Sequence, residues 1–246
     1  SPKYMREHPN AQYSLNHATQ IRRQPGSAFK PLVYTLSLEA GLTPDSLVES
    51  GPYTYELITG DKWTPGGSHD SAGTKITLQE GLRRSINSVA ARLVTQVINP
   101  RAVVSLARRM GINSPLHSVP AIALGGGGEV KPIELVSAYG TFAYKGYHVE
   151  PYYIEKIEDR FGNVLYEKKP ATRIRDAMDQ QTAITMTRMM QQVIQGGTAW
   201  RIKKYFKEAE CAGKTGTTNG NTDAWFVGYT PELVAGLWVG FDDQRI

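Results

Sequence analysis

The stretch Arg23-Gln24-Pro25-Gly26-Ser27-Ala28-Phe29-Lys30-Pro31 decides how the rest of the chain is interpreted. A proline followed by a glycine is typical of a helix entry, because proline suits the first turn and glycine lets a backbone or a ligand come close. The apolar pattern that follows predicts a helix from Pro25 to about Ala40, which stops at the next glycine. Ser27 and Lys30 then share one helix face. We therefore expect the Lys30 amine to reach the Ser27 hydroxyl, as a base beside a nucleophile.

A serine at a helix N-terminus has two explanations. In most helices such a serine is only a cap, and a Ser-x-x-Lys pattern also arises by chance. The positive end of the helix dipole, however, is where an alkoxide or an oxyanion is least costly. The choice between the two explanations depends on the rest of the chain.

Composition describes a soluble globular chain. Its 246 residues are enough for one large domain or two small ones, and 40% of them are hydrophobic. The sequence contains no run of 18 apolar residues, and its first ten residues lack the apolar segment of a signal peptide. The single cysteine, Cys211, excludes an internal disulfide and a thiolate metal cluster, and we interpret it as a small core residue.

The charge is moderately basic, with 28 lysines and arginines against 23 acidic residues. An excess of this size is compatible with nucleic acid or with another anionic partner. The basic residues are spread thinly, however, and their densest groups are not interleaved with aromatic residues as in a single-strand binding groove. We therefore interpret them as solvated faces and predict no nucleic-acid partner. The groups are Arg22-Arg23, Arg83-Arg84, Arg108-Arg109 and Arg201 to Lys207.

Hydrophobic periodicity predicts a helical first part followed by strands, an α+β pattern. After a polar, irregular segment 1–24 and the first helix, residues 43–74 are expected to form a long surface excursion with short strands at most. Further helices are predicted at Thr77–Val97, Arg101–Met110, Pro132–Lys145 and Asp179–Ile194, with a short basic helix after Gly197. Strands are predicted as a hairpin over Tyr152–Tyr166, with its turn at Phe161-Gly162-Asn163, and at Glu210–Lys214, Ala224–Tyr229 and Leu233–Val239.

Three short motifs give the chemistry when they are taken together. The first is the Ser27 to Lys30 pattern, the second is Ser85-Ile86-Asn87, and the third is Lys214-Thr215-Gly216-Thr217 at the end of a predicted strand. Each motif is weak alone. In this order they are the set that characterises serine β-lactamases and penicillin-binding proteins.

The flanking residues extend the comparison over nearly the whole chain. They are Asn16 to Gln20 ahead of the serine motif, Ala123-Leu124-Gly125, Glu129 to Leu135, Gly197-Thr198, and Ala212 to Thr218 followed by Asp223 to Thr230. With these residues the chain closely resembles the transpeptidase domain of the class A penicillin-binding proteins, which are bifunctional peptidoglycan synthases.

The resemblance implies a β-lactamase/D,D-transpeptidase-like fold, in which an antiparallel sheet is flanked by helices and joined to an all-helical subdomain. Residues 1–246 are then one transpeptidase domain, with a mainly helical part at 25–145 and a hairpin, helices and sheet strands at 150–246. The family's sheet has strands before the serine motif and a strand and a helix after the last motif. We therefore expect a fragment with an incomplete sheet. The resemblance also implies a full-length protein with a glycosyltransferase domain and a membrane anchor outside this chain, in an extracytoplasmic location.

The resemblance assigns the acyl-transfer roles. Ser27 attacks a stem peptide that ends in D-Ala-D-Ala, and Lys30 takes its proton if burial and the nearby Lys214 keep the Lys30 amine neutral. Ser85 relays a proton to the leaving amine. The backbone N–H groups of Ser27 and Thr217 form the oxyanion hole.

The remaining motif residues are assigned to substrate binding. Asn87 holds the substrate backbone, while Lys214, Thr215 and Thr217 hold its terminal carboxylate. Gly216 leaves room for a ligand along the strand edge. An amine from a neighbouring stem peptide then resolves the acyl-enzyme, without metal or cofactor. β-Lactam antibiotics are expected to acylate Ser27.

Several alternatives stay open at this point. A β-lactamase would need a group that activates water, and the chain contains no Glu-x-x-Leu-Asn segment of the kind that those enzymes use. A D,D-carboxypeptidase and a β-lactam sensor that never turns over would share every motif. A P-loop is excluded, because Glu208 stands where that motif requires glycine. The five histidines show no metal-ligand spacing, and Gly125 to Gly128 are interpreted as a tight loop.

Overall fold

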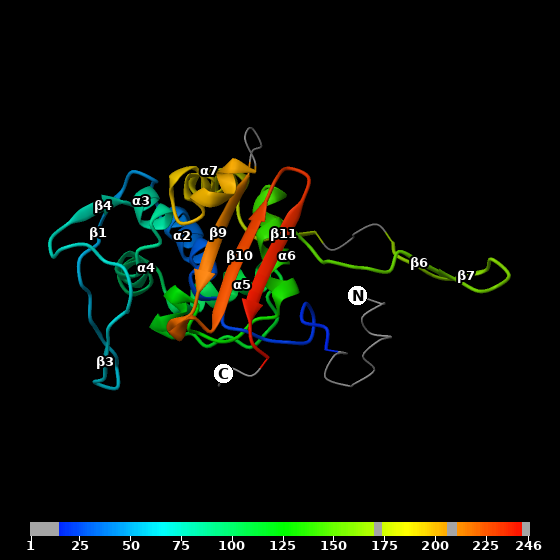
Figure 1. The fold of residues 1–246 in the computed structure, drawn as a ribbon, viewed down its shortest axis with the longest axis horizontal. Helices are drawn as coiled ribbons and strands as arrows, with labels where there is room; N and C mark the ends of the chain where they lie inside the picture. The colour runs from blue at the N-terminus through cyan, green and yellow to red at the C-terminus, as the bar shows by residue number, and fades with distance from the viewer. Residues whose placement is uncertain (1–14, 170–173, 206–210, 243–246) are drawn as a thin grey trace.

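A computed structural model of the chain describes residues 15–169, 174–205 and 211–242. The α+β prediction is confirmed: a three-stranded antiparallel sheet packs against helices, and smaller two-stranded pairs lie around this body (Figure 1). The predicted polar segment 1–24 is described only from residue 15, and the predicted start of the last sheet's first strand, Glu210, lies outside the described residues.

The main sheet carries the third motif on its edge. Its strands are β9 (Ala212–Thr217), β10 (Asp223–Tyr229) and β11 (Val234–Gly240), in the order β11-β10-β9. All three strands were predicted, and the register pairs Thr217 with Ala224. Because β10 covers one side of β9 and the described residues place no strand on the other, the Lys-Thr-Gly strand has a free edge.

The helices differ from the predictions at two places that matter for the site. The first helix begins as a 3₁₀ turn, η2 (Gly26–Phe29), before the α-helix α2 (Lys30–Glu39). The predicted Thr77–Val97 helix is wrong as a single element: it is interrupted between α3 (Leu78–Arg83) and α4 (Asn87–Arg92), which continues as a π-helical turn, η3 (Leu93–Val97). The other helices are α5 (Pro100–Arg109), α6 (Pro132–Ala143) and α7 (Gln180–Gly196).

The interruption has a local cause at Ser85. Its φ of 58° lies in the left-handed region, and the next residue, Ile86, is extended. The apolar positions on both sides keep their helical spacing and stay buried. Periodicity shows which side chains are buried, but it does not show that one residue has a left-handed backbone conformation. The sequence pattern therefore did not reveal the break.

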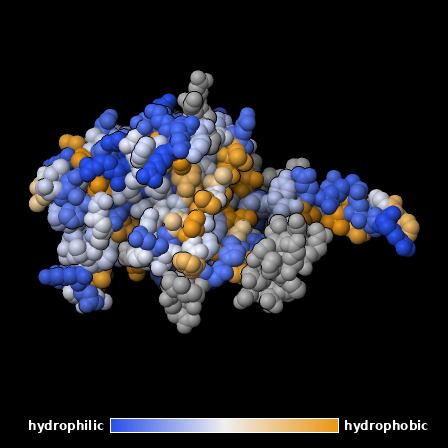
Figure 2. All heavy atoms as spheres, in the orientation of Figure 1, coloured by the Kyte–Doolittle hydropathy of each residue, from blue (hydrophilic) through white to orange (hydrophobic). Residues whose placement is uncertain are grey.

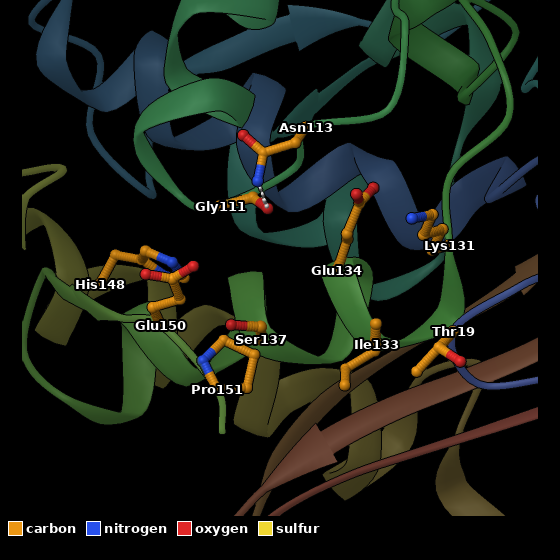
Figure 3. Close-up of a pocket in the computed structure, with 10 residues that line it drawn as sticks. All are labelled: Thr19, Gly111, Asn113, Lys131, Ile133, Glu134, Ser137, His148, Glu150 and Pro151. Atoms are coloured by element: carbon orange, nitrogen blue, oxygen red, sulfur yellow. Dashed lines mark hydrogen bonds between the residues drawn. The ribbon is translucent and has the colours of Figure 1, made fainter. Parts of the chain in front are cut away.

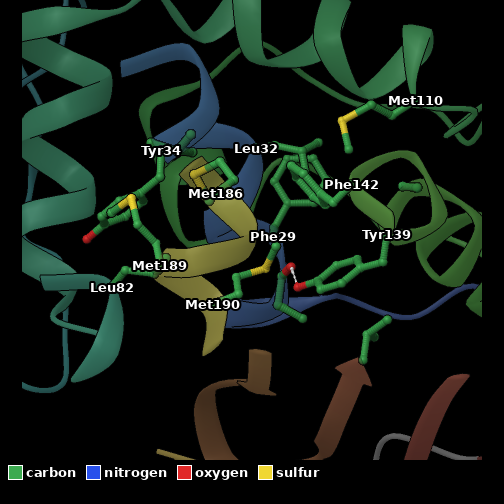
Figure 4. Packing of buried hydrophobic residues seen from close by; sticks show 14 of the residues in the cluster. Phe29, Leu32, Tyr34, Leu82, Met110, Tyr139, Phe142, Met186, Met189 and Met190 are labelled. Carbon is green, nitrogen blue, oxygen red and sulfur yellow. Dashed lines mark hydrogen bonds between the residues drawn. The ribbon is translucent and has the colours of Figure 1, made fainter. Parts of the chain in front are cut away.

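The core is organised around α2, as Figure 4 shows. Phe29 at the end of η2 and Leu32 and Tyr34 of α2 are fully or almost fully buried, and they lie among residues of α6 and α7. The predicted methionine stripe of α7 is confirmed as core packing, since Met186, Met189 and Met190 are buried there. The Tyr139 hydroxyl of α6 also donates to the Ala28 carbonyl at 2.7 Å. The serine motif is thus fixed to the core.

Short strands and turns complete the fold. The two-stranded pairs are β1 (Leu47–Glu49) with β4 (Lys75–Thr77), β2 (Tyr55–Glu56) with β3 (Lys62–Trp63), β5 (Tyr147–Val149) with β8 (Ile174–Asp176), and β6 (Lys156–Glu158) with β7 (Val164–Glu167). The short helical turns are η4 (Pro120–Leu124), η5 (Trp200–Lys204) and η6 (Asn219–Asn221). The predicted hairpin is confirmed as β6-β7, which projects from the body (Figure 1).

The surface is mixed in polarity. Figure 2 shows apolar side chains over the sheet and along the projecting hairpin, among a largely polar surface. The β11 residues Leu237 and Val239 are exposed, as are Val164 and Leu165 of the hairpin. No helix within the described ranges is both long enough and apolar enough to cross a lipid bilayer.

Candidate active site

Two of the three motifs meet at a buried lysine. The Lys30 Nζ donates to the Ser85 carbonyl oxygen at 2.6 Å, to the Ser85 Oγ at 3.2 Å and to the Asn87 Oδ1 at 2.6 Å. A charged amine fills these contacts with its three N–H donors, whereas a neutral amine has two N–H donors and a lone pair that can accept from a hydroxyl. The side chain is fully buried. The left-handed Ser85, in the turn between α3 and α4, and Asn87, the first residue of α4, supply these acceptors.

The third motif reaches the same hydroxyl through Lys214. The Lys214 Nζ donates to the Ser85 Oγ at 2.9 Å and to the Thr215 carbonyl at 3.0 Å. Lys214 is as fully buried as Lys30. The Ser85 hydroxyl therefore lies between two amines that occupy its lone pairs, and its own proton is free to be donated.

The position of the two lysines lowers both pKa values. Burial lowers the pKa of Lys30 well below its ordinary value, and the charge of the neighbouring Lys214 lowers it further. Burial lowers the pKa of Lys214 to about 7. Two ammonium groups that share one hydroxyl repel each other, so at neutral pH the cluster favours a state with one or both amines neutral.

We expect the low pKa of Lys214 to make stability depend on pH. The unfolded chain keeps this proton up to about 10.5, whereas the folded chain releases it near 7. The unfolded state therefore binds more protons between those values, and stability rises with pH there. Replacing Lys214 with Met removes this dependence. The melting temperature of Lys214→Met minus that of the wild type should be most positive near pH 6–7 and fall towards pH 9.5. A difference that does not change with pH would contradict the assignment.

The structure gives Lys30 other partners than the predicted Ser27 hydroxyl. In the part of the chain that the structure describes, no hydrogen bond joins the Lys30 Nζ to the Ser27 side chain, and the Nζ contacts the Ser85 and Asn87 oxygens instead. Ser27 itself is half-buried and lines a cleft. The i, i+3 spacing did place both residues at the same turn, but the contact of the amine is set by tertiary packing.

Two glycines let η2 press against the end of β9. A Cβ atom on Gly26 would lie 2.6 Å from the Thr217 carbonyl oxygen, and a Cβ on Gly216 would lie 2.6 Å from the Pro25 carbonyl oxygen. The backbones of the serine motif and of the Lys-Thr-Gly strand are therefore in direct contact. The Thr218 N–H donates to the Asp223 carbonyl on β10. Because successive N–H groups of a strand alternate in direction, the Thr217 N–H points to the free edge.

We expect Gly26→Ala to be destabilising and to impair the site. The residue has a φ of +52° and its new Cβ would collide with backbone, so strain and overpacking together should cost about 2–4 kcal/mol. Gly41→Ala is the matched control, because Gly41 has a φ of +97° but no atom within 4 Å of the new Cβ. Urea unfolding gives the loss of stability of each variant. The strain of a positive φ affects both variants, whereas the collision with backbone affects only Gly26→Ala. Equal losses of stability would contradict close contact between η2 and β9.

A cleft of about 260 Å³ opens beside these groups. Ser27, Asn87 and Thr217 line it, together with neighbours of the quoted motifs and with the loop after β3, which the sequence did not single out for the site. Those further residues are Gln24, Gly26, Trp63 to Gly66, Ala121, Leu124, Gly126 and Thr218. The Asn87 amide donates to the Gly66 carbonyl, which fixes the loop after β3 as one wall. Part of the predicted surface excursion thus borders the site.

The other substrate-binding candidates lie on β9. Thr215 is half-buried, and its hydroxyl is 2.7 Å from the Thr198 hydroxyl. Gly216 is buried against η2, while Thr217 is exposed at the cleft. The structure therefore brings Lys30, Ser85, Asn87 and Lys214 into direct contact and places Ser27 and Thr217 on the adjoining cleft. No sequence signal connects the loop 63–66 to this cleft, because its contact with Asn87 is purely tertiary.

A second pocket, shown in Figure 3, contains none of the predicted catalytic or substrate-binding residues. It also measures about 260 Å³, and its lining includes Lys131 and Glu134 from the start of α6 and His148 and Glu150 from the β5 region. The Glu134 carboxylate accepts from the Ser114 N–H and hydroxyl. None of the three motifs contributes to this pocket.

A serine beside a cleft, a hydroxyl shared by two buried lysines and a free strand edge are groups that acyl transfer by a serine would require. Residues 1–237 match the family model described as the penicillin binding protein transpeptidase domain. The chain belongs to this family, as the sequence predicted.

Two relatives and one complex place the chain more closely. It is 37% identical to penicillin-binding protein 1A of Neisseria lactamica over 238 residues. This match covers 94% of the chain and 29% of the length of that protein. The fold is similar to the crystal structure of penicillin-binding protein 1A from Haemophilus influenzae, with a TM-score of 0.85 and 28% identity, over 96% of this chain and 40% of that one. It is also similar to the PonA1 protein of Mycobacterium tuberculosis in complex with penicillin V, with a TM-score of 0.73 and 27% identity, over 92% of this chain and 62% of that one.

Proposed function

We propose that residues 1–246 form one D,D-transpeptidase domain that cross-links peptidoglycan by serine acyl transfer. The observation that carries the proposal is the Ser85 hydroxyl, which lies between the buried Lys30 and Lys214 amines beside the cleft that Ser27 lines. Membership of the transpeptidase family supports it, as does the similarity to a protein in complex with penicillin V. The chain spans 29% of the length of the curated relative from Neisseria lactamica.

The first half-reaction forms an acyl-enzyme. Lys30, neutral because of its lowered pKa, takes the Ser27 proton as the Ser27 Oγ attacks the penultimate D-Ala carbonyl carbon. The resulting oxyanion accepts hydrogen bonds from the N–H groups of Ser27 and Thr217. Loss of one such donor raises the barrier by about 3–4 kcal/mol in a comparable serine enzyme. The C–N bond then breaks, and the proton that Lys30 took from Ser27 passes through the Ser85 hydroxyl to the leaving D-Ala amine.

The second half-reaction regenerates the serine. An amine from a neighbouring stem peptide attacks the ester carbonyl, loses a proton to the lysine cluster and expels the Ser27 oxygen, which takes that proton back. An amide cross-link forms as the ester breaks, and the sum is a ping-pong transfer. Water in place of the amine would give a D,D-carboxypeptidase.

The negative charge of the substrate affects the protonation of the two lysines. A terminal carboxylate bound by Lys214, Thr215 and Thr217 favours the charged form of Lys214, because an opposite charge raises a lysine pKa. A charged Lys214 in turn lowers the pKa of Lys30. Substrate binding thus helps to keep the base neutral. Asn87 at the cleft wall offers its amide to the peptide backbone, and the free edge of β9 accepts the peptide alongside Gly216.

The proposed partners are peptidoglycan stem peptides and β-lactam antibiotics. We propose an extracytoplasmic location, with a membrane anchor and a glycosyltransferase domain in the full-length protein. The mechanism uses the chain's own side chains and backbone groups.

A product assay tests this function against its alternatives. The protein is incubated with a peptide ending in D-Ala-D-Ala, with and without an acceptor amine, and the products are separated by mass. We expect an amide-linked dimer and released D-Ala that depend on the acceptor. Hydrolysis alone would indicate a carboxypeptidase, and rapid turnover of penicillin would indicate a β-lactamase. A penicillin adduct without any peptide product would indicate a sensor and contradict the proposal.

A further inference from the structure

The two proposed oxyanion donors come from segments that are far apart in the sequence. The Ser27 N–H belongs to η2 and the Thr217 N–H to the end of β9. The contact between their backbones limits how closely the two segments approach, but it does not fix their relative position. A network beneath the cleft supplies that connection, and it centres on Asp223, the first residue of β10.

Asp223 is a buried carboxylate, 2% exposed, which accepts hydrogen bonds from several side chains. The Thr218 and Thr222 hydroxyls lie 3.1 and 3.2 Å from its Oδ2, and the Trp238 Nε1 donates to its Oδ1 at 2.9 Å. The Asp223 N–H in turn donates to the Thr218 Oγ1 at 3.0 Å. These reciprocal contacts close the turn that follows Thr217 and so fix the end of β9.

Arg23 connects this turn to the serine segment. It is also buried, 5% exposed, and its Nε lies 3.9 Å from the Asp223 Oδ1, within the range of a charge pair. Its guanidinium donates to the Phe241 and Asp242 carbonyls beyond β11 and lies over the Trp238 ring. Its backbone exchanges two hydrogen bonds with Val130. The chain from Arg23 enters η2 only three residues later.

We propose that Asp223 and Arg23 are positioning residues that set the separation of the Ser27 and Thr217 N–H donors. The inference rests on the proposed function. Two opposite charges buried side by side hold their elements in one arrangement, since either charge alone would be left uncompensated. The Trp225 Nε1, which donates to the Gln24 carbonyl at 3.0 Å, ties the same two segments a second time. Neither charged side chain is among the residues that line the cleft.

The test separates binding from reaction. Stopped-flow kinetics with a chromogenic β-lactam gives the dissociation constant of the first complex and the acylation rate constant. For Asp223→Asn and Arg23→Gln we expect the rate constant to fall about 10- to 100-fold, because a small misplacement of an oxyanion donor has effects of that size. The dissociation constant should change less than about threefold, since the groups that hold the carboxylate remain.

Three further variants control for stability. Asp179→Ala removes the side chain that caps α7 and should lower the melting temperature without changing acylation. Arg23→Lys keeps the charge and should restore part of the rate. If the two charge variants fail to fold, Trp238→Phe, which removes one hydrogen bond to Asp223, should still lower the acylation rate constant.

A folded Asp223→Asn or Trp238→Phe variant with an unchanged acylation rate constant rejects this inference and leaves the proposed function standing. A wild type that is never acylated rejects the proposed function and the inference with it.

Discussion

Ser27→Ala should show no acylation burst with penicillin and no cross-linked product. The variant loses the only oxygen that the mechanism places for attack, and in a comparable serine enzyme the loss of the nucleophile lowers kcat by about 10⁶. Its fold should be retained, because Ser27 is half-buried and, among the described residues, its hydroxyl makes no hydrogen bond that holds the structure. Product analysis and burst kinetics measure the loss, and the melting temperature checks the fold.

Ser37→Ala is the matched control. Ser37 lies on α2, the helix that follows η2, is buried, and donates to the Val33 carbonyl at 3.0 Å. It should lose a little stability and keep its full acylation rate. Normal acylation of Ser27→Ala, with the control behaving as expected, would reject Ser27 as the nucleophile.

Lys30→Met should lower the acylation rate constant by about 10²- to 10⁴-fold, the usual contribution of a general base. Wild-type acylation should rise with pH, because the base works only after it loses its proton and burial has moved its pKa downward. Methionine has a similar length and no titrating group, so the pH dependence that is due to Lys30 should disappear with it. Rate against pH for both proteins is the measurement.

The stability of Lys30→Met reflects two opposing effects. The variant no longer buries an amine, which is favourable, but it leaves the Ser85 carbonyl and the Asn87 Oδ1 without their donor. Lys156→Met on the exposed hairpin is the control for removing a lysine, and its acylation should be unchanged. If Lys30→Met keeps the wild-type rate and pH profile, another group is the base.

Much of the fold followed from local pattern. Apolar spacing at 3.6 residues predicted α5, α6 and α7, and alternation predicted β10 and β11 and the β6-β7 hairpin. The interruption at Ser85 did not follow, because its left-handed backbone leaves the buried positions on both sides unchanged. The 3₁₀ form of η2 was likewise invisible, since 3₁₀ and α-helical turns share the same residue preferences at a helix start.

The site could be predicted as a set of residues but not as a set of contacts. The order of the three motifs indicated which residues belong together. The partners of Lys30 depend on how the turn before α4 packs on α2, a tertiary contact without a local signature. The cleft wall at Trp63 to Gly66 and the Asp223–Arg23 pair were missed for the same reason, since each joins segments whose spacing in the sequence carries no signal.

The location of the penicillin adduct tests the central claim most directly. The wild-type protein is labelled with penicillin, digested with trypsin and sequenced by mass spectrometry. Cleavage after Arg23 releases the serine motif in a peptide that extends past Lys30, because trypsin does not cut before Pro31. We predict a single adduct in this peptide, on the Ser27 oxygen. An adduct on Ser85, on either lysine or on any other residue would contradict the account.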